Sequence, residues 1–587
     1  MTAIVARAYL SPSLVLLAMD WADGGERKDF LGFAVRRTPG FADLKTGRLG
    51  QEDWLPNRIG FHGPTPAGQP DPPTNTAPIQ KFMWWDAHLE GVTPDTPLTY
   101  EIFPVCGDAS DPQVLQADGA RVEVQLPRHV EHNIGTWFNR AVMSSQAFSR
   151  MAEAIGIDLH TKPNDEQALK LRSWLANGME KPVPDFIAGA GNTVVGAIYH
   201  LTDGLWIIPA LAKAQREKDV ELVYDGKTKG DGEGNGNPNA GAIEALGSVT
   251  FDKRDKTNIM HNKFLVGGNN LTRGSGEPLA LTCGSANYTT EGLTSQANLI
   301  HTFASPELAS LYLERFQILR TNPTKGVTAH GAEWSKTVSV GDVGVRVFFS
   351  PEPGKAGKDH SASIETIVQA IHGAASSVLF CLFDPTDKEL RDACFAAGDA
   401  GKMMFGLVNK VAQQEPTAEP DESGHIRADR LAALEIYHRS KDARDVIGGE
   451  YFGGNNLPEG FQREVNIFPG DRPPPFPPVI IHHKFVIIDA ETDSPVLYTG
   501  SANMSGNSVF GNDENLLEMK GSPRLAHIYL AEFLRLYEHY RARASFISSK
   551  KGGGNTFSLS ADSGWAKKHY KRGTPEYKAR LRMLGED

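Results

Sequence analysis

The stretch IIHHKFVIID at residues 480–489 is followed by GSAN at residues 500–503. It has a counterpart earlier in the chain, MHNKFLV at residues 260–266, which is followed by GSAN at residues 284–287. In both places an imidazole, an ammonium, a hydroxyl and an amide group occur in the same order beside apolar residues. One such set would be a weak signal, but two sets with similar spacing indicate two halves of one site.

Each set predicts a strand that presents its charged side chains on one face. Side chains at positions i and i+2 of a strand point to the same side. His482 and Lys484 are therefore predicted to share a face, as are His261 and Lys263. His483 is predicted to point away and to tolerate replacement. The GSAN turns are predicted to bring further hydrogen-bonding side chains to the same place: Ser285, Asn287, Ser501 and Asn503.

A pocket with two imidazoles, two ammonium groups and several hydrogen-bond donors suits a phosphate diester, whose charge spreads over its non-bridging oxygens in the transition state. One histidine is suited to attack phosphorus and form a phosphohistidine. The other is suited to protonate the leaving alcohol and then to activate water or a second alcohol. Because the lysines neutralise the phosphate charge, the pattern predicts neither a metal ion nor a cofactor.

The chain repeats itself around these motifs. SPELASLYLERF at residues 305–316 and SPRLAHIYLAEF at residues 522–533 share Ser-Pro, Leu-Ala, Tyr-Leu and Phe at matching places. Each copy predicts a helix with serine as N-cap and proline at the first helical position. Buried strands and helices alternate from about residue 190. This duplication predicts an α/β fold of two similar lobes related by a pseudo-twofold axis.

Changes of pattern along the chain predict five segments. Short β-rich runs separated by Gly, Pro and Asp predict a small all-β, sandwich-like domain over residues 1–130. A polar helical connection is expected over residues 131–189. The two α/β lobes are assigned to residues 190–340 and 341–547. A polar, solvated tail is expected at residues 548–587.

Three local features outside the motifs carry predictions of their own. Trp84 and Trp85 either line a binding surface, or one of them belongs to the core and the other is partly covered. The polyproline run at residues 472–478 either forms a fixed wall beside the site or is a rigid spacer. Asn164 is predicted to be a helix N-cap.

The totals exclude some classes of protein. With 587 residues the chain is too long for one ordinary core, and its composition, 40% hydrophobic and 22% charged, is that of a globular protein. Its net charge of −11 disfavours non-specific binding to nucleic acid. The four cysteines are widely spaced, which predicts free thiols. No apolar run reaches the roughly 18–20 residues of a membrane span, and no signal peptide is recognisable, which predicts a cytoplasmic protein.

The doubled motif resembles the phospholipase D superfamily, whose signature HxKxxxxD followed by GSxN is normally present twice. The second copy is complete from His482 to Asp489, and the acidic residue that usually follows is matched by Glu514. The first copy departs from the pattern, because Gly268 stands where Asp is expected and residues 296–298 lack the later Glu.

The resemblance covers about residues 190–545 and implies roles for these side chains. In two-lobed members the first histidine is the usual nucleophile, so His261 is expected to attack phosphorus and His482 to be the general acid. Glu514 is expected to orient one imidazole and to hold its proton on the useful nitrogen. The motif Asp is expected to be mainly structural, so its loss from the first copy bears on the support of His261.

The leading hypothesis is a phospholipase D that hydrolyses or transphosphatidylates glycerophospholipids to give phosphatidic acid. Such an enzyme would bind a phospholipid and touch the membrane transiently. The first alternative is a nuclease or another phosphodiesterase of the same superfamily, which the acidic charge disfavours. The second alternative is a catalytically impaired binding module that uses the first lobe only for structure.

Overall fold

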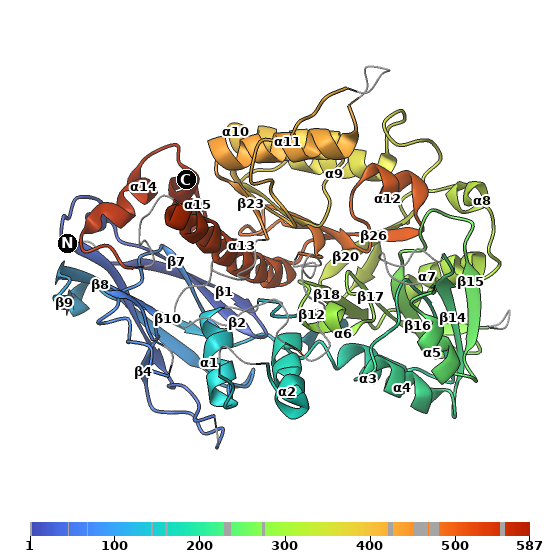
Figure 1. Ribbon diagram of the computed structural model, residues 1–587, viewed down its shortest axis with the longest axis horizontal. Coiled ribbons are helices and arrows are strands. Elements are labelled where there is room, and N and C mark those ends of the chain that lie inside the picture. Colours follow the sequence, from blue (N-terminus) through green and yellow to red (C-terminus); the bar gives the residue numbers. More distant parts are fainter. Residues whose placement is uncertain are drawn as a thin grey trace.

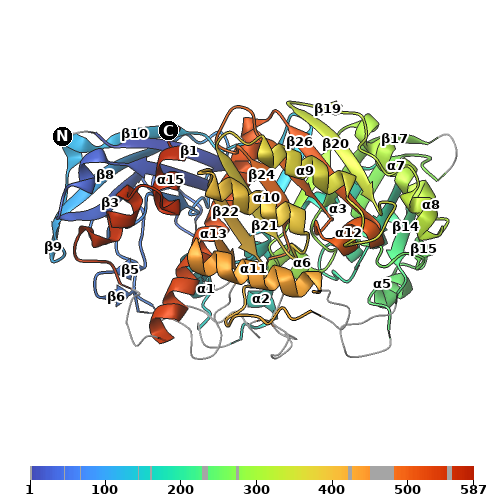
Figure 2. The ribbon, with the colours of Figure 1, turned by 90° about the horizontal axis from the view of Figure 1, so that it is seen from above.

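The computed structural model describes residues 3–44, 46–66, 68–142, 145–158, 162–227, 236–272, 276–420, 426–449, 468, 481–551 and 558–586. Figure 1 shows the N-terminal strands in blue at one end and the two large sheets at the other. The long helix α13 (Pro523–Lys551) crosses between them, as the view from above in Figure 2 also shows. The polyproline run 472–478 lies outside the described residues.

The N-terminal strands form two small sheets and a short hairpin. The three-stranded sheet has the order β1 (Val5–Ser11), β2 (Leu14–Asp20) and β7 (Met83–Asp86). The five-stranded sheet has the order β10 (Ala120–Val124), β8 (Leu98–Asp108), β3 (Phe30–Thr38) and β4 (Asp53–Trp54), with β9 (Asp111–Val114) paired to β8. The hairpin consists of β5 (Ile59–Gly60) and β6 (Gly63–Pro64).

The connection after these strands is only partly helical, which corrects the prediction for residues 131–189. It begins with β11 (Val130–Glu131) and β12 (Ile134–Phe138), and β12 pairs with β18 (Leu299–Phe303) of the first large sheet. The helices α1 (Gln146–Ala154), α2 (Asp165–Ala176) and α3 (Pro182–Gly189) follow. All residues of β12 are buried. This short segment is therefore part of the core of the first large sheet and not of a polar connection.

The first large sheet has eight strands. Their order is β11, β12, β18, β17 (Glu277–Gly284), β16 (Lys263–Asn269), β13 (Thr193–Ile198), β14 (Asp219–Asp225) and β15 (Thr250–Arg254). Only the pairs β13–β14 and β14–β15 are parallel. The helices of this part are α4 (Ile207–Ala214), α5 (Ala240–Ala245), α6 (Thr290–Thr294), α7 (Pro306–Leu319) and α8 (Lys325–Ala329).

The second large sheet has the same number of strands in a corresponding order. It runs β19 (Val338–Val340), β20 (Val343–Ser350), β26 (Glu514–Lys520), β25 (Val496–Gly500), β24 (Lys484–Ile488), β21 (Ser377–Leu382), β22 (Met403–Val408) and β23 (Val446–Gly448). Again only the pairs at one end, β21–β22 and β22–β23, are parallel. Its helices are α9 (Ala362–His372), α10 (Lys388–Asp399), α11 (Ala428–Asp442) and α12 (Gly506–Gly511).

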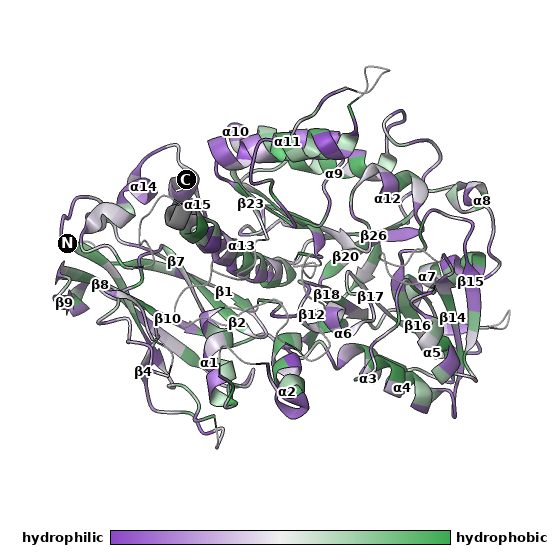
Figure 3. Ribbon diagram, viewed as in Figure 1, coloured by the Kyte–Doolittle hydropathy of each residue, from purple (hydrophilic) through white to green (hydrophobic). Residues whose placement is uncertain are grey.

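The two large sheets share one core. Their facing sides pack on each other together with α7 and α13, through residues such as Phe264, Tyr312, Phe485 and Tyr529. The other side of the first sheet is covered by α3, α4 and α5, and that of the second by α9 and α10. Figure 3 shows hydrophilic residues on α2, α10 and α11. Because both faces are covered, the strands that carry the motifs are buried and meet solvent only at their ends.

Three predicted helix starts are confirmed. Asn164 and Gln167 form a capping box at the start of α2. Ser305 caps α7 with Pro306 behind it, and Ser522 accepts a hydrogen bond from the Leu525 N–H at the start of α13. Among the helices that the structure describes, none combines the length and the apolar character needed to cross a bilayer.

The C-terminal segment is not a solvated tail, which corrects the prediction for residues 548–587. After α13 come a 3₁₀ turn (Ser563–Ala566), α14 (Lys567–Tyr570) and α15 (Pro575–Arg582). Ala566 is buried in the N-terminal core and Met583 in the core shared by the large sheets. The Tyr9 hydroxyl donates to the carbonyl oxygen of Met583. This segment is rich in lysine and arginine, so the composition hid the apolar residues that dock it.

Candidate active site

The two histidine segments are each anchored to the other large sheet. Met260 forms a parallel bridge with Asp513, and the His261 N–H donates to the Asp513 carbonyl oxygen. In the same way Ile481 bridges to Ala297, and the His482 N–H donates to the Ala297 carbonyl oxygen. The residue after each bridge is thus brought beside a histidine: Glu514 lies beside His261, and Asn298 lies beside His482.

Glu514 orients His261. Its Oε2 lies 2.8 Å from Nδ1 of His261, and its Oε1 accepts hydrogen bonds from Ser508 and Asn512. Burial lowers the pKa of His261 to about 4, although Glu514 opposes the shift. Burial by itself would raise the pKa of Glu514, but the charge and hydrogen bond of His261 lower it overall. A neutral His261 with its proton on Nδ1 leaves the Nε2 lone pair free to act as a nucleophile or base.

Asn298 occupies the corresponding place beside His482. Its Oδ1 lies 2.8 Å from Nδ1 of His482 and also accepts a hydrogen bond from the Ser285 hydroxyl. The sequence analysis read the stretch 296–298 only as lacking a Glu, and it missed this residue. A signal was present, because Asn298 lies as far beyond Ser285 as Glu514 lies beyond Ser501.

Both lysines of the motifs are buried beside their histidines. Nζ of Lys263 donates to the His261 carbonyl oxygen at 2.6 Å, and Nζ of Lys484 donates to the His482 carbonyl oxygen at 2.6 Å. Burial lowers the pKa of Lys263 to about 7. Burial, and then the charge of Lys263, hold the pKa of Lys484 well below its usual range.

The charged groups of the two halves act on one another. Burial and then the nearby charges of Lys484, Lys263 and His261 lower the pKa of His482 well below its usual range. Among the described residues, the carboxylates that act on Lys263 are Glu514 and, more weakly, Asp225, against four groups of the motifs that can carry positive charge. This arrangement favours an anion over a neutral ligand.

The hydroxyl groups of the GSAN turns have structural partners. Ser285 Oγ also accepts from the Leu299 N–H, and Ser501 Oγ accepts from the Asn515 N–H. A Cβ at Gly284 or Gly500 would lie 2.3 Å from a carbonyl oxygen of the neighbouring strand, so only glycine fits there. Ser285 and Ser501, which were predicted as hydrogen-bond donors of the site, therefore hold the segments that carry Asn298 and Glu514.

The asparagines of the same turns differ from the serines. The Oδ1 atoms of Asn287 and Asn503 are buried and have no hydrogen-bond partner among the residues that the structure describes. Buried amide groups are normally paired, and unpaired ones need an explanation. Because the same amide oxygen is unpaired in both motifs, Asn287 and Asn503 are candidates to bind a ligand.

The carboxylate of Asp489 has a structural role and does not contact the histidines. Its carboxylate accepts hydrogen bonds from the N–H groups of residues 375–377, at the start of β21. In the first half Gly268 stands at a β-bulge, and the next residue, Asn269, accepts from the Asn192 N–H at the start of β13. The missing Asp therefore alters the support of a strand end and leaves the Glu514 contact of His261 intact.

His483 does point away from its neighbours in the motif, but its surroundings argue against tolerance of replacement. It is 1% exposed, and its ring lies 5.4 Å from that of Phe138 and 5.1 Å from that of Phe485. Neither ring nitrogen has a partner among the described residues. A small residue there would leave a cavity, which is costly in a close-packed core.

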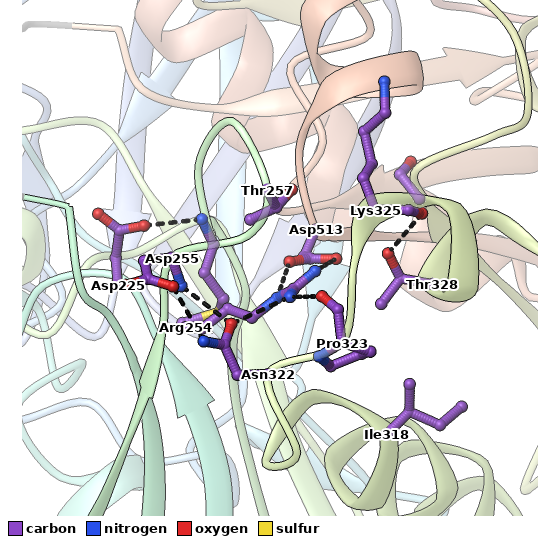
Figure 4. Close-up of polar contacts among 12 residues, drawn as sticks. Asp225, Arg254, Asp255, Thr257, Ile318, Asn322, Pro323, Lys325, Thr328 and Asp513 are labelled. Atoms are coloured by element: carbon purple, nitrogen blue, oxygen red, sulfur yellow. Dashed lines mark hydrogen bonds and ion pairs between the residues drawn. The ribbon is translucent and has the colours of Figure 1, made fainter.

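A buried ion pair fixes the segment that carries Glu514. Arg254 Nε lies 2.7 Å from Asp513 Oδ2, and both side chains are fully buried. Figure 4 shows Arg254 between Asp513 and the loop with Asn322 and Pro323, to both of which it also donates. Arg315 adds a second contact to Asp513 at 3.4 Å.

A second pair of contacts holds the residues just before the histidines. Asp225, at the end of β14, accepts from the Met260 N–H. Asn409, just after β22, accepts from the Ile481 N–H. Burial raises the pKa of Asp225 to about 6, with its hydrogen bond from Met260 opposing.

Among the described residues, no group of three or more His, Cys, Asp or Glu side chains is arranged to hold a metal ion.

Comparison with known proteins gives a family model that matches part of the chain and several distant structures. Residues 367–537 match a family model described as "Cardiolipin synthase, PLD-like domain". No curated protein sequence matches the chain. Phosphatidylserine synthase of Haemophilus influenzae is 11% identical, with 63% of this chain and 84% of that chain covered and a TM-score of 0.39.

Two further structures show the same level of likeness. Polyphosphate kinase from Porphyromonas gingivalis is 13% identical, with 60% of this chain covered and a TM-score of 0.33. That match spans 45% of the kinase, less than half of its length. Nuc from Salmonella typhimurium, a phospholipase D family member, is 21% identical over 24% of this chain and 85% of that chain, with a TM-score of 0.20.

Replacing Arg254 by methionine should destabilise the protein by about 3–5 kcal/mol, because Asp513 would keep a buried charge with only the longer Arg315 contact. The free energy of unfolding in urea measures the change. The double variant R254M/D513N should recover part of the loss, since it removes the stranded charge. Arg121→Met, at an exposed pair, is the control. A loss for R254M no larger than that of the control would contradict the assignment.

Asn298→Asp should raise the pKa of His482, because a carboxylate would replace a neutral amide 2.8 Å from Nδ1. An opposite charge at this distance typically strengthens proton binding tenfold or more, by about one to three orders of magnitude. An NMR titration of the histidine rings measures it, with His261 as internal reference. Asn298→Ala is the matched control, which removes the hydrogen bond without adding charge. An equal effect of both variants on His482 would show that the contact does not orient the ring.

Proposed function

We propose that the chain, whose residues 367–537 match a phospholipase D-like family model, is a phosphodiesterase that acts on glycerophospholipids through a phosphohistidine. Hydrolysis would give phosphatidic acid, and an alcohol in place of water would give transphosphatidylation. The observation that carries the proposal is the pair of oriented imidazoles, His261 on Glu514 and His482 on Asn298, in one buried and cation-rich site. We also propose that residues 190–340 and 341–547 are two similar lobes about a pseudo-twofold axis, preceded by an all-β domain.

In the proposed first step His261 is the nucleophile. Its Nε2 attacks phosphorus, an N–P bond forms, and the bond from phosphorus to the leaving alcohol oxygen breaks. The carboxylate of Glu514 stabilises the positive charge that develops on the imidazole, since it lies on the opposite nitrogen. Lys263 and Lys484 take the charge of the non-bridging oxygens.

His482 is the general acid of the proposed first step. His482, which binds a second proton once the negative diester lies beside it, gives its Nε2 proton to the leaving alcohol oxygen. In the second step neutral His482 takes a proton from water or from an acceptor alcohol, whose oxygen attacks phosphorus while the N–P bond breaks. Because Asn298 is neutral, it holds the ring without making the imidazolium harder to deprotonate.

Two observations support a lipid over a nucleic acid. The chain carries a net charge of −11, whereas proteins that bind nucleic acid through its backbone are usually basic. The matching family model is described as a cardiolipin synthase domain, and cardiolipin is a phospholipid. The alternatives, a nuclease and a non-catalytic binding module, predict different outcomes in one experiment.

The full chain should release phosphatidic acid from phosphatidylcholine in mixed micelles and leave single-stranded DNA uncut. His261→Ala and His482→Ala should each lower turnover by about 10²–10⁴-fold, the usual size of a general acid–base contribution or larger. His360→Ala, whose side chain is exposed, is the control. Phosphatidic acid and DNA fragments are measured side by side.

Each other outcome selects an alternative. Cleavage of DNA alone would replace the lipid by a nucleic acid as substrate. If neither histidine variant alters the turnover of any diester, the non-catalytic binding module would be the remaining hypothesis. Mass spectrometry of acid-quenched protein should find the phosphoryl adduct on His261, and an adduct on His482 would reverse the two roles.

The pH dependence follows from Lys263. Its pKa of about 7 in the empty site means that it loses its positive charge as the pH rises through neutrality. Affinity for the diester should fall with that charge, so kcat/KM should decrease above about pH 7. Lys263→Arg keeps the charge and should move the decrease to higher pH. A kcat/KM profile that stays level through the alkaline range would contradict a substrate contact by Lys263.

A further inference from the structure

A cavity of about 170 Å³ lies away from the histidines, between the N-terminal strands and the helices around α13. Its walls include residues of β7, α1, α2 and α13; in Figure 1, α1 and α2 lie below β7 and α13. None of the motif residues lines it. A water molecule takes about 30 Å³ of liquid, so the space equals roughly five or six waters, or one six-membered ring with a small substituent.

The cavity is rich in positive charge. The cationic side chains in its wall outnumber the acidic ones. Three of the cations have acidic partners: Lys81 lies 3.1 Å from Glu538, Arg535 lies 3.1 Å from Glu532, and Arg150 lies 2.9 Å from Asp71. The cationic members are Lys81, Arg140, Arg150, Arg535 and Arg543, and the acidic members are Glu532 and Glu538.

Arg140 is a cation of this wall that has no acidic partner among the described residues. Among the residues that the structure describes, no carboxylate lies within ion-pair distance of it, and its Nε donates to the carbonyl oxygen of Trp174. Its guanidinium lies 4.4 Å from the centre of the Trp174 ring. Burial lowers the pKa of Arg140 to about 10, so it still carries its charge at neutral pH. A charge that is desolvated and unpaired is a site for an anion.

Aromatic rings form the rest of the wall. Trp84 and Trp85 both line the cavity, with ring centres 5.9 Å apart and planes 17° from parallel. Of the two alternatives for these tryptophans, a binding surface is therefore the one that agrees with their place. Trp174 completes the aromatic surface. Rings of this kind bind flat groups by stacking.

Some buried polar atoms of the lining residues have no hydrogen-bond partner among the residues that the structure describes. They include Nε2 of His88, Nε2 of His539 and Nε1 of Trp174. Unpaired buried donors cost free energy, which water or a ligand with oxygen acceptors would recover. Beside Arg140, Nε1 of Trp174 donates, and Nε2 of His539 donates in its Nε2–H tautomer, so that more than one oxygen of the same ligand can be met. Nε2 of His88 is an acceptor, because Nδ1 of that ring donates to Asp86.

We propose that this cavity binds a small aromatic anion, a flat ring that carries a phosphate or a carboxylate. The ring lies against the tryptophans and the oxyanion meets Arg140. The inference is independent of the proposed phosphodiesterase, because it rests on residues that the catalytic site does not use.

The test is calorimetric titration of the full chain with phenyl phosphate and with benzoate, which separate the two oxyanions. Phenol and inorganic phosphate are titrated as the ring and the charge alone. At least one aromatic anion should bind more tightly than either fragment. Arg140→Met and Trp174→Leu should each weaken that binding by about tenfold or more, which corresponds to about 1.4 kcal/mol. Arg121→Met, at an exposed pair far along the N-terminal strands, should leave it unchanged.

Phenyl phosphate could also enter the catalytic site, so Lys263→Met is titrated alongside. Binding that survives Lys263→Met and is lost in Arg140→Met supports the cavity. Binding that survives Arg140→Met, or absence of binding by both aromatic anions, overturns the proposal, and the cavity then holds water only. Thermal unfolding of each variant verifies that the protein is folded, and Trp174→Leu provides a second test if Arg140→Met is unstable.

Discussion

Two short backbone bridges, Met260 to Asp513 and Ile481 to Ala297, hold the active-site region together. Each joins the segment before a histidine in one half to the segment before an orienting side chain in the other. As a result Glu514 serves His261 and Asn298 serves His482, across the boundary between the halves. Neither half contains a complete oriented imidazole. The match to residues 367–537 therefore covers His482 and Glu514 but not their partners.

The two imidazoles have unequal partners, and this inequality fits the two tasks of the proposed reaction. A carboxylate stabilises a positive ring, which suits the histidine that would carry phosphorus on its other nitrogen. A neutral amide orients the ring while leaving its proton easier to give up, which suits a general acid. In the sequence, the first copy of the motif was read as having lost the later Glu. In the structure, Asn298 stands at the place of that Glu and faces His482.

The sequence predicted those parts of the site that depend on local pattern. The shared face of His482 and Lys484 follows from strand geometry, and the caps of α2, α7 and α13 follow from single residues. The partner of Glu514 depended on which segments meet across the two halves, which no local pattern contains. Asn298 was missed because the search was for an acidic residue and not for a spacing.

Elsewhere the predictions failed where burial is decided by distant segments. The strand β12 joins the first large sheet because its buried residues meet β18, more than a hundred residues away in the chain. The C-terminal helices look polar in composition, yet Met583 docks in the core and its carbonyl oxygen receives the Tyr9 hydroxyl. His483 was correctly placed on the far face of its strand, but that face is the packed interior.

The electrostatics of the site favour an anion because the protein leaves its cations short of counter-charge. Burial disfavours the charged forms of His261, Lys263, His482 and Lys484, and the nearby carboxylates, Glu514 and Asp225, do not restore all of them. A diester entering the site would supply negative charge where desolvation has made it most effective, and each cation would bind its proton more tightly. The lysines are held by the carbonyl oxygens of their own histidines, so their side-chain nitrogens are already in position when the anion arrives. Little reorganisation would then be needed, which is the condition under which fixed charges stabilise a transition state best.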